Sequence, residues 1–126
     1  MALLLRCSSF IFLGLLAACS QTSSPDPLDL ASRGPEERKL IEQGRGVYQT
    51  ICTACHHSDP RKPGAIGPDI SGSSLELIRS KVILGKYPEG VAPKKALLNG
   101  MSQMPPMPTL EKDIPALHSY LNAFKP

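Results

Sequence analysis

The residues with the clearest chemical potential are two cysteines and a histidine in the pentapeptide 52–56, Cys-Thr-Ala-Cys-His. The pattern C-x-x-C-H is typical of covalent haem attachment, in which Cys52 and Cys55 each form a thioether and His56 ligates the iron. A C-x-x-C pair also occurs as a redox dithiol, usually beside a βαβ unit, or as half of a zinc site that needs a second ligand pair. The chain's other two cysteines lie in its apolar N-terminal stretch and form no second C-x-x-C.

A further set of candidate ligands lies in the segment 100–108, Gly-Met-Ser-Gln-Met-Pro-Pro-Met-Pro, which holds three of the four methionines. Methionine usually fills gaps in a hydrophobic core. The prolines here stiffen the segment and leave it few backbone hydrogen bonds, which favours a rigid arm that presents a thioether sulfur. The candidates are Met101, Met104 and Met107.

The element that must position the cysteines is a helix predicted to begin at Pro35, which suits the first helical position, with an apolar pattern that extends to Ile51. Two glutamates follow Pro35, where the helix dipole favours negative charge. Small or apolar positions recur every three or four residues, at Leu40, Gly44, Val47, Tyr48 and Ile51. A glycine inside a helix costs about 1 kcal/mol relative to alanine, so Gly44 indicates close approach by another backbone.

Two more helices are predicted beyond a polar loop at 57–64, in which His57 is expected to be solvated. The sequence 73–76, Ser-Ser-Leu-Glu, is a capping box for a helix that ends at Leu84, with Gly85 as its stop. Its expected buried residues are Leu75, Ile78 and Val82. The last helix begins near Asp113 and Pro115, and its expected inner face is Leu117, Tyr120, Leu121 and Phe124. The sequence also allows a short helical turn over 94–98.

In their order and spacing these features resemble a class I cytochrome c domain from about Pro35 to Pro126. The matching positions are Gly44, Tyr48, the Cys-x-x-Cys-His at 52–56, the Gly-Pro-Asp at 67–69, the Met-Pro-Pro at 104–106, and Leu117 and Tyr120 of the last helix. The resemblance implies an all-α fold of about four short helices with long loops around one haem c, attached through Cys52 and Cys55.

The resemblance also implies a set of site residues. His56 and Met104 are the expected axial ligands, and the carbonyl of Pro68 accepts a hydrogen bond from the His56 ring nitrogen that faces away from iron. Such a contact fixes the tautomer and makes the imidazole a stronger donor. Met101 and Met107 remain alternatives to Met104, as does a site with no methionine ligand. His118 is the one other conceivable ligand on a structured element.

The N-terminus has the features of an exported protein. Residues 1–18 are predicted to be a signal peptide, because a single arginine precedes an apolar run too short to span a bilayer. Residues 16–19, Leu-Ala-Ala-Cys, resemble a bacterial lipobox, which implies lipid on Cys19; the alternative is plain cleavage after Ala18. Residues 19–34 are expected to form a flexible tether with a reach on the order of 20 Å, and 35–126 the domain. Ser20 favours the outer membrane in a Gram-negative host.

Composition limits the classes of function. The chain has 126 residues, a net charge of +3, 5% aromatic residues and no tryptophan, so a large buried cofactor would supply apolar volume that its side chains lack. This charge balance does not suggest nucleic-acid binding. Four lysines form a loose basic set that is expected to be solvated, with a docking patch for an acidic redox partner as the minority interpretation: Lys81, Lys86, Lys94 and Lys95.

The predicted function is that of a membrane-tethered one-electron carrier on the periplasmic side, and not of an enzyme. With histidine and methionine on iron, no coordination site remains for a substrate, and the expected partners are other redox proteins. The first alternative is an electron-transfer subunit of a larger periplasmic redox enzyme. The second is a haem peroxidase or gas sensor with a labile methionine ligand.

Overall fold

The computed structural model describes residues 28, 30–94 and 104–124. Its elements are α1 (Pro35–Ile51), the 3-10 helix η1 (Cys52–Ala54), α2 (Leu75–Leu84), the 3-10 helix η2 (Pro108–Asp113) and α3 (Ile114–Leu121). Among these residues the chain has no strand, only an isolated bridge, so the all-α class is confirmed for the described part. No helix there combines the length and apolarity needed to cross a membrane.

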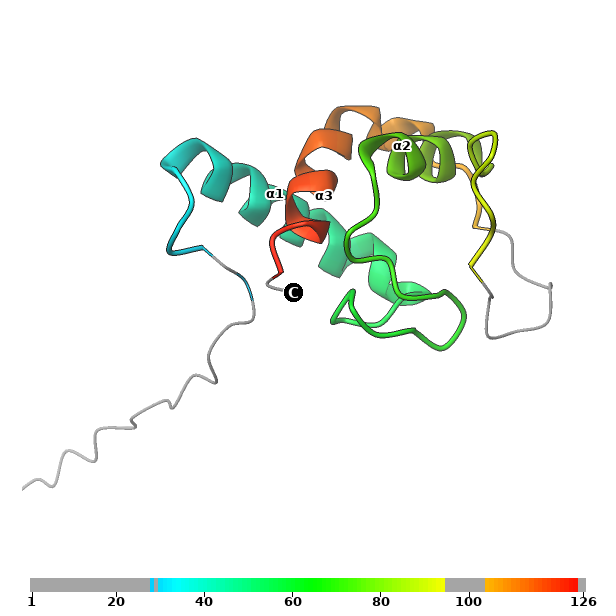
Figure 1. The fold of residues 1–126 in the computed structure, drawn as a ribbon, viewed down its shortest axis with the longest axis horizontal. Coiled ribbons are helices and arrows are strands. Elements are labelled where there is room, and N and C mark those ends of the chain that lie inside the picture. The colour runs from blue at the N-terminus through cyan, green and yellow to red at the C-terminus, as the bar shows by residue number, and fades with distance from the viewer. Residues whose placement is uncertain (1–27, 29, 95–103, 125–126) are drawn as a thin grey trace, which may run out of the picture.

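Helices α1 and α3 cross at the centre of the molecule (Figure 1). A Cβ on Gly44 would overlap the carbonyl of Ala116 and lie 2.9 Å from the Cβ of Tyr120, so the two backbones meet at this glycine, as predicted. The rings of Tyr48 and Tyr120 pack next to it, with their centroids 5.2 Å apart. This crossing is the core of the domain. It also fixes the orientation of α1, and therefore the position of Cys52, which directly follows the helix.

The buried face of α1 is narrower than its apolar pattern indicates. Ile41, Gly44 and Tyr48 are buried, whereas Leu40 and Ile51 are 39% and 37% exposed. Leu40 and Ile51 thus lie on the apolar face that the periodicity indicates but are only partly covered. The physical reason is the size of the partner, because α3 has eight residues and covers only a narrow stripe of a longer helix.

The ends of α2 are set by local chemistry. The N-cap is Ser74, whose Oγ accepts a hydrogen bond from the Leu77 amide at 3.2 Å, so the cap is a single serine and the predicted capping box does not form. Gly85 ends the helix in the left-handed region at φ 68°, as predicted. Ile78 and Val82 are buried, but Leu75 is 43% exposed because it is the first residue of the helix.

The packed part of the chain begins before α1. Leu28 is 8% exposed, forms an antiparallel bridge with Phe124 and accepts a backbone hydrogen bond from Leu30 at 3.0 Å. Leu30 also packs against the core. These two leucines belong to the segment predicted as a tether, so packing against the domain extends at least to Leu28, seven residues before Pro35. Cys19 and the signal peptide lie outside the described residues.

Candidate functional site

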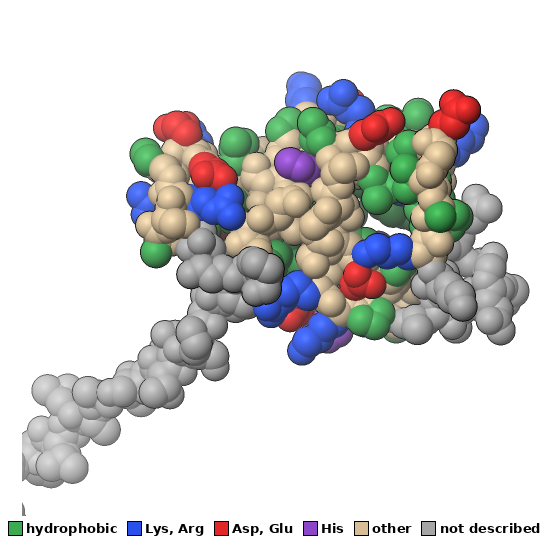
Figure 2. Space-filling model, in the orientation of Figure 1, with side chains coloured by type: hydrophobic (Ala, Val, Ile, Leu, Met, Phe, Trp, Pro, Cys, Tyr) green, Lys and Arg blue, Asp and Glu red, His purple; other side chains and the backbone are tan. Residues whose placement is uncertain are grey.

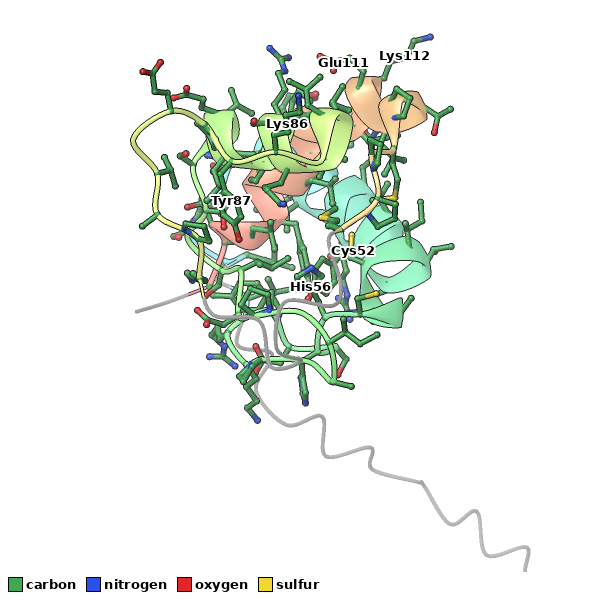
Figure 3. All side chains as sticks on the ribbon, turned by 90° about the vertical axis from the view of Figure 1, so that its right-hand side faces the viewer. Cys52, His56, Lys86, Tyr87, Glu111 and Lys112 are labelled. Atoms are coloured by element: carbon green, nitrogen blue, oxygen red, sulfur yellow. The ribbon has the colours of Figure 1, made fainter. Side chains whose placement is uncertain are left out.

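The turn that follows α1 gathers the cysteines and the histidine of the motif. The helix tightens into η1, and the amides of Cys55 and His56 both donate to the carbonyl of Cys52, at 3.1 and 2.9 Å. One turn of chain therefore carries all three side chains. Figure 3 shows Cys52 and His56 close together near the middle of one side of the domain, below α2.

The two thiols are free and half-buried. Burial, followed by the effect of Cys55, raises the pKa of Cys52 to about 11, so this thiol is protonated at neutral pH. Redox dithiols of the C-x-x-C type depend instead on a lowered thiol pKa, because the thiolate is the nucleophile. The electrostatics of Cys52 therefore disfavour a dithiol redox pair.

His56 is held in one orientation by a backbone carbonyl. Its Nδ1 lies 2.9 Å from the oxygen of Pro68, the contact that the sequence resemblance implies. A carbonyl can only accept, so Nδ1 donates this hydrogen bond. The ring is thereby oriented with Nε2 as the nitrogen left to ligate a metal.

Glycines make room for this arrangement. A Cβ on Gly67 would lie 2.5 Å from Cε1 and 2.7 Å from Nδ1 of the His56 ring, so only glycine lets the chain pass beside the imidazole. The Gly67 amide donates to the Cys55 carbonyl at 2.9 Å. A Cβ on Gly64 would overlap the same carbonyl. The loop after His56 therefore folds back onto the motif.

The structure gives His57 a role that the sequence does not reveal. Its backbone oxygen accepts the Tyr48 hydroxyl at 2.6 Å, and its Nδ1 accepts the amide of Asp59 at 2.9 Å. His57 is half-buried, so the expectation of a solvated side chain is only partly met. The Tyr48 hydroxyl thus joins α1 to the loop, and the imidazole of His57 holds the next turn of the loop. The signal for this contact in the sequence is that residue 48 is tyrosine. Phenylalanine would pack equally well, so the hydroxyl of Tyr48 indicates a hydrogen-bond partner.

The methionine arm approaches the site from another part of the chain. The Met107 amide donates to the Val82 carbonyl at 2.7 Å, and the Met104 carbonyl would lie 3.2 Å from a Cβ on Gly85. The arm therefore runs along the C-terminal end of α2, with the side chains of Met104 and Met107 half-buried against the core. Met101 lies outside the described residues. His118 is half-buried on α3, apart from this arm.

Several partly buried apolar side chains pack against the core from the segments that carry the site. Those packed against the core from α1, η1, the loop, α2 and the methionine arm are Val47, Cys52, Ile70, Ile83, Met104 and Met107. Figure 2 shows a hollow between the segment 86–94, which forms the right-hand edge of the view, and the body of the domain. The sulfur-bearing side chains of the candidate site thus come from two separate segments, the turn after α1 and the methionine arm, and both segments pack against the same core.

The basic set does not form one free patch. Nζ of Lys81 donates to the Gly85 carbonyl at 3.1 Å and lies 4.4 Å from the centroid of the Tyr87 ring, and burial lowers its pKa. Lys94 is paired with Asp69 at 2.7 Å. Lys86 is exposed, as predicted, and Lys95 lies outside the described residues.

The described side chains do not form a site for a bare metal ion. Within the described ranges, no group of three or more His, Cys, Asp or Glu side chains is arranged to hold a metal ion. A haem brings four nitrogen ligands of its own and needs only one or two from the protein, so a haem site is compatible with this finding. Comparison with protein families, with curated proteins and with solved structures found no match.

Proposed function

We propose that this protein is a monohaem c-type cytochrome with the fold of that family, and that it carries one electron at a time between redox proteins. The observation that supports this most strongly is the state of His56. Its Nδ1 donates to the Pro68 carbonyl, and its other ring nitrogen belongs to the same turn as the thiols of Cys52 and Cys55. Neither a redox dithiol nor a zinc site built on a C-x-x-C pair requires an adjacent imidazole held in this orientation.

The residues present fit a haem. Cys52 and Cys55 supply the two thiols, and each thioether forms when an S–H adds across a vinyl double bond, which consumes no other reactant. The half-buried apolar side chains on the turn after α1 and on the methionine arm suit a flat, largely apolar ring. When bound, the haem supplies one-electron exchange at its exposed edge. The chain itself orients one ligand, limits water and holds the ring by covalent bonds.

Met104 is the proposed sixth ligand. Its arm is fixed to α2 by the Met107 amide and is stiffened by two prolines, so the arm holds its sulfur with little loss of entropy. With both axial positions filled, electron transfer is favoured over reaction with peroxide or a gas. A peroxidase or gas sensor would require a labile methionine.

The first test is the mass of the mature protein under denaturing conditions. We expect the chain to carry one haem that dissociation cannot remove, and a reduced spectrum of the c type in alkaline pyridine. Cys52→Ser or Cys55→Ser should leave at most one thioether and little mature protein. Unmodified thiols in the wild type would rule out the haem assignment.

The second test concerns Met104. We expect Met104→Ala to retain covalent haem, to lose the weak red absorbance band of methionine ligation, to lower the reduction potential and to admit carbon monoxide to the reduced iron. Met107→Ala is the matched control, because it lies on the same arm and should keep the band. Equal carbon monoxide binding by the wild type and Met104→Ala would exclude Met104 as a ligand.

We also propose that lipid on Cys19 holds the protein on the periplasmic side of a membrane, with the outer membrane favoured in a Gram-negative host. Two or three acyl chains bind firmly, whereas one chain alone is marginal. Cys19→Ala should give an uncleaved precursor. Recovery of the wild type from the soluble periplasmic fraction, without acyl groups, would overturn the anchor and leave the haem proposal intact.

One observation favours the alternative of a subunit within a larger redox enzyme. A groove of about 530 Å³ runs along the outer face of α2, and Leu84 at its edge is 61% exposed. Its lining residues are Leu75, Glu76, Arg79, Ser80, Leu84 and Pro88. Gentle solubilisation followed by native mass measurement distinguishes the two roles: a free carrier has the mass of one chain, and a subunit has the mass of its complex.

A further inference from the structure

We infer that the ion pair between Lys94 and Asp69 is a positioning device for His56, and that it sets the strength of the hydrogen bond from the imidazole to Pro68. This inference rests on the proposed function and extends it. It assigns a role in tuning the site to a lysine that the sequence places among solvated surface charges. The pair joins residues that are 25 positions apart in the chain.

The contact holds the residue next to the histidine's acceptor. Nζ of Lys94 donates to the Asp69 carboxylate at 2.7 Å and also to its backbone carbonyl at 2.9 Å. Two bonds to one residue restrict both its side chain and its backbone. Because Asp69 directly follows Pro68, they also restrict the peptide group whose oxygen accepts the His56 proton at 2.9 Å.

The neighbouring residues of this loop are held by other means. The Gly67 amide donates to Cys55 at 2.9 Å, and the amides of Ile70 and Ser71 donate to the Pro60 carbonyl at 2.9 and 3.0 Å. All of these bonds are internal to the loop that follows the motif. The bond from Lys94 comes from outside it, at the end of the segment 86–94 that borders the hollow in Figure 2.

Stability alone does not account for this geometry. Both side chains are about half exposed, at 48% for Lys94 and 45% for Asp69, and exposed ion pairs contribute little to folding. The pairing lowers the pKa of Asp69, so its carboxylate is ionised at neutral pH. The two hydrogen bonds to Asp69 instead fix the orientation of the Pro68–Asp69 peptide group. That orientation matters because the strength of the hydrogen bond from His56 to the Pro68 carbonyl depends steeply on angle.

The expected effect on the site has a definite sign. A strong hydrogen bond from Nδ1 makes the imidazole a better donor, which stabilises oxidised iron and lowers the reduction potential. Loss of positioning should therefore raise the potential. Loss of the Lys94 charge by itself should lower it, since a nearby positive charge favours the reduced form. The two explanations predict opposite shifts.

The test is the double variant Lys94→Met/Asp69→Asn in the full holoprotein. It removes one positive and one negative charge together, so their electrostatic effects nearly cancel. We expect a higher reduction potential than in the wild type, and exchange of the Gly67 and Ile70 amides about fivefold faster, the order of an exposed ion pair. The proton signal of His56 Nδ1 should shift toward that of a weaker hydrogen bond.

The matched control is Arg79→Met/Glu111→Gln. It removes an ion pair of 3.1 Å with similar exposure, 55% and 49%, which links α2 to η2. This variant should leave the potential, the two amides and the His56 signal unchanged. If Lys94→Met/Asp69→Asn behaves like the control, or if its potential falls, the positioning role is overturned.

Failure of the proposed function is recognised separately. If the wild type carries no haem, the cytochrome proposal fails and no potential can be measured. The amide exchange rates and the His56 Nδ1 signal remain measurable in that protein. Those two observations then decide whether Lys94 positions the Pro68 carbonyl.

Discussion

The crossing of α1 with α3 and the loop that follows the Cys-x-x-Cys-His motif are stabilised in different ways. At the crossing, Ile41 and Tyr48 are fully buried and Leu117 is 2% exposed, so apolar packing holds it together. In the loop from 55 to 71, hydrogen bonds to backbone carbonyls hold residues most of which are half-buried or exposed. The comparison shows that most of the stability and most of the chemistry reside in separate regions, which meet at Tyr48.

The largest expected effect comes from disrupting the crossing. We expect Gly44→Val to cost well over 3 kcal/mol and to prevent folding, because its side chain would occupy the position of the Ala116 carbonyl. Urea or thermal unfolding monitored by circular dichroism measures the change.

The control for this variant is Gly46→Ala on the same helix. No atom lies within 4 Å of a Cβ at Gly46, so alanine should stabilise the protein by up to about 1 kcal/mol through helix propensity. Similar unfolding midpoints for the two variants would mean that α1 and α3 do not cross at Gly44.

A smaller effect is expected in the loop. Gly67→Ala should displace the His56 ring, since its Cβ would lie 2.5 Å from Cε1, and should cost about 1–3 kcal/mol. The fold should survive, because the crossing is untouched, while the His56 Nδ1 proton loses its hydrogen-bonded signal. Gly34→Ala, where a Cβ meets nothing within 4 Å, is the reference variant and should leave the His56 signal unchanged. An unchanged His56 signal in Gly67→Ala would contradict this geometry.

The smallest loss of stability at neutral pH is expected for a substitution at Tyr48, where the two regions meet. Tyr48→Phe keeps the ring packed against Tyr120 but removes the hydroxyl that donates to the His57 carbonyl at 2.6 Å. We expect a loss of about 1 kcal/mol, typical of one hydrogen bond. Amide exchange should accelerate in the loop and not at the crossing. Uniform acceleration throughout the domain would show that the two regions unfold together.

The same hydroxyl predicts an alkaline limit to stability. Burial, more than any nearby charge, raises the pKa of Tyr48 above its ordinary value, so the folded state keeps the proton longer than the unfolded chain. The stabilisation is complete below about pH 10 and declines as the pH rises further. Unfolding free energies measured from pH 8 to 11 should fall less steeply for Tyr48→Phe than for the wild type.

Features decided by local chemistry could be predicted from the sequence. Pro35 and Gly85 mark helix ends because proline and glycine act on the backbone where they stand, and the structure places both ends there. Gly44 was informative for the same reason: a glycine inside a helix has a local cost that only a close neighbour explains. The contact from His56 to Pro68 followed from the family resemblance and is present.

Features decided by the size and position of distant segments could not be predicted. Periodicity shows that Leu40 and Leu75 are apolar, but their exposure depends on the short helix α3 and on the place of Leu75 at a helix start. The pairing of Lys94 with Asp69 joins two loops whose separation no local pattern encodes. No local pattern encodes the bridge between Leu28 and Phe124 either, because the two residues lie far apart in the chain.

The bridge between Leu28 and Phe124 also determines where force enters the domain. A pull transmitted through the N-terminal segment reaches the described part of the domain at Leu28, next to the end of α3, and not at the start of α1. From an anchored Cys19, the stretch to Leu28 extends at most about 30 Å even when straight. An anchored domain would therefore be attached to the membrane through a point next to its own C-terminal end, by a short connection. It would rotate about that point, which limits the faces that it can present to a partner in the same membrane.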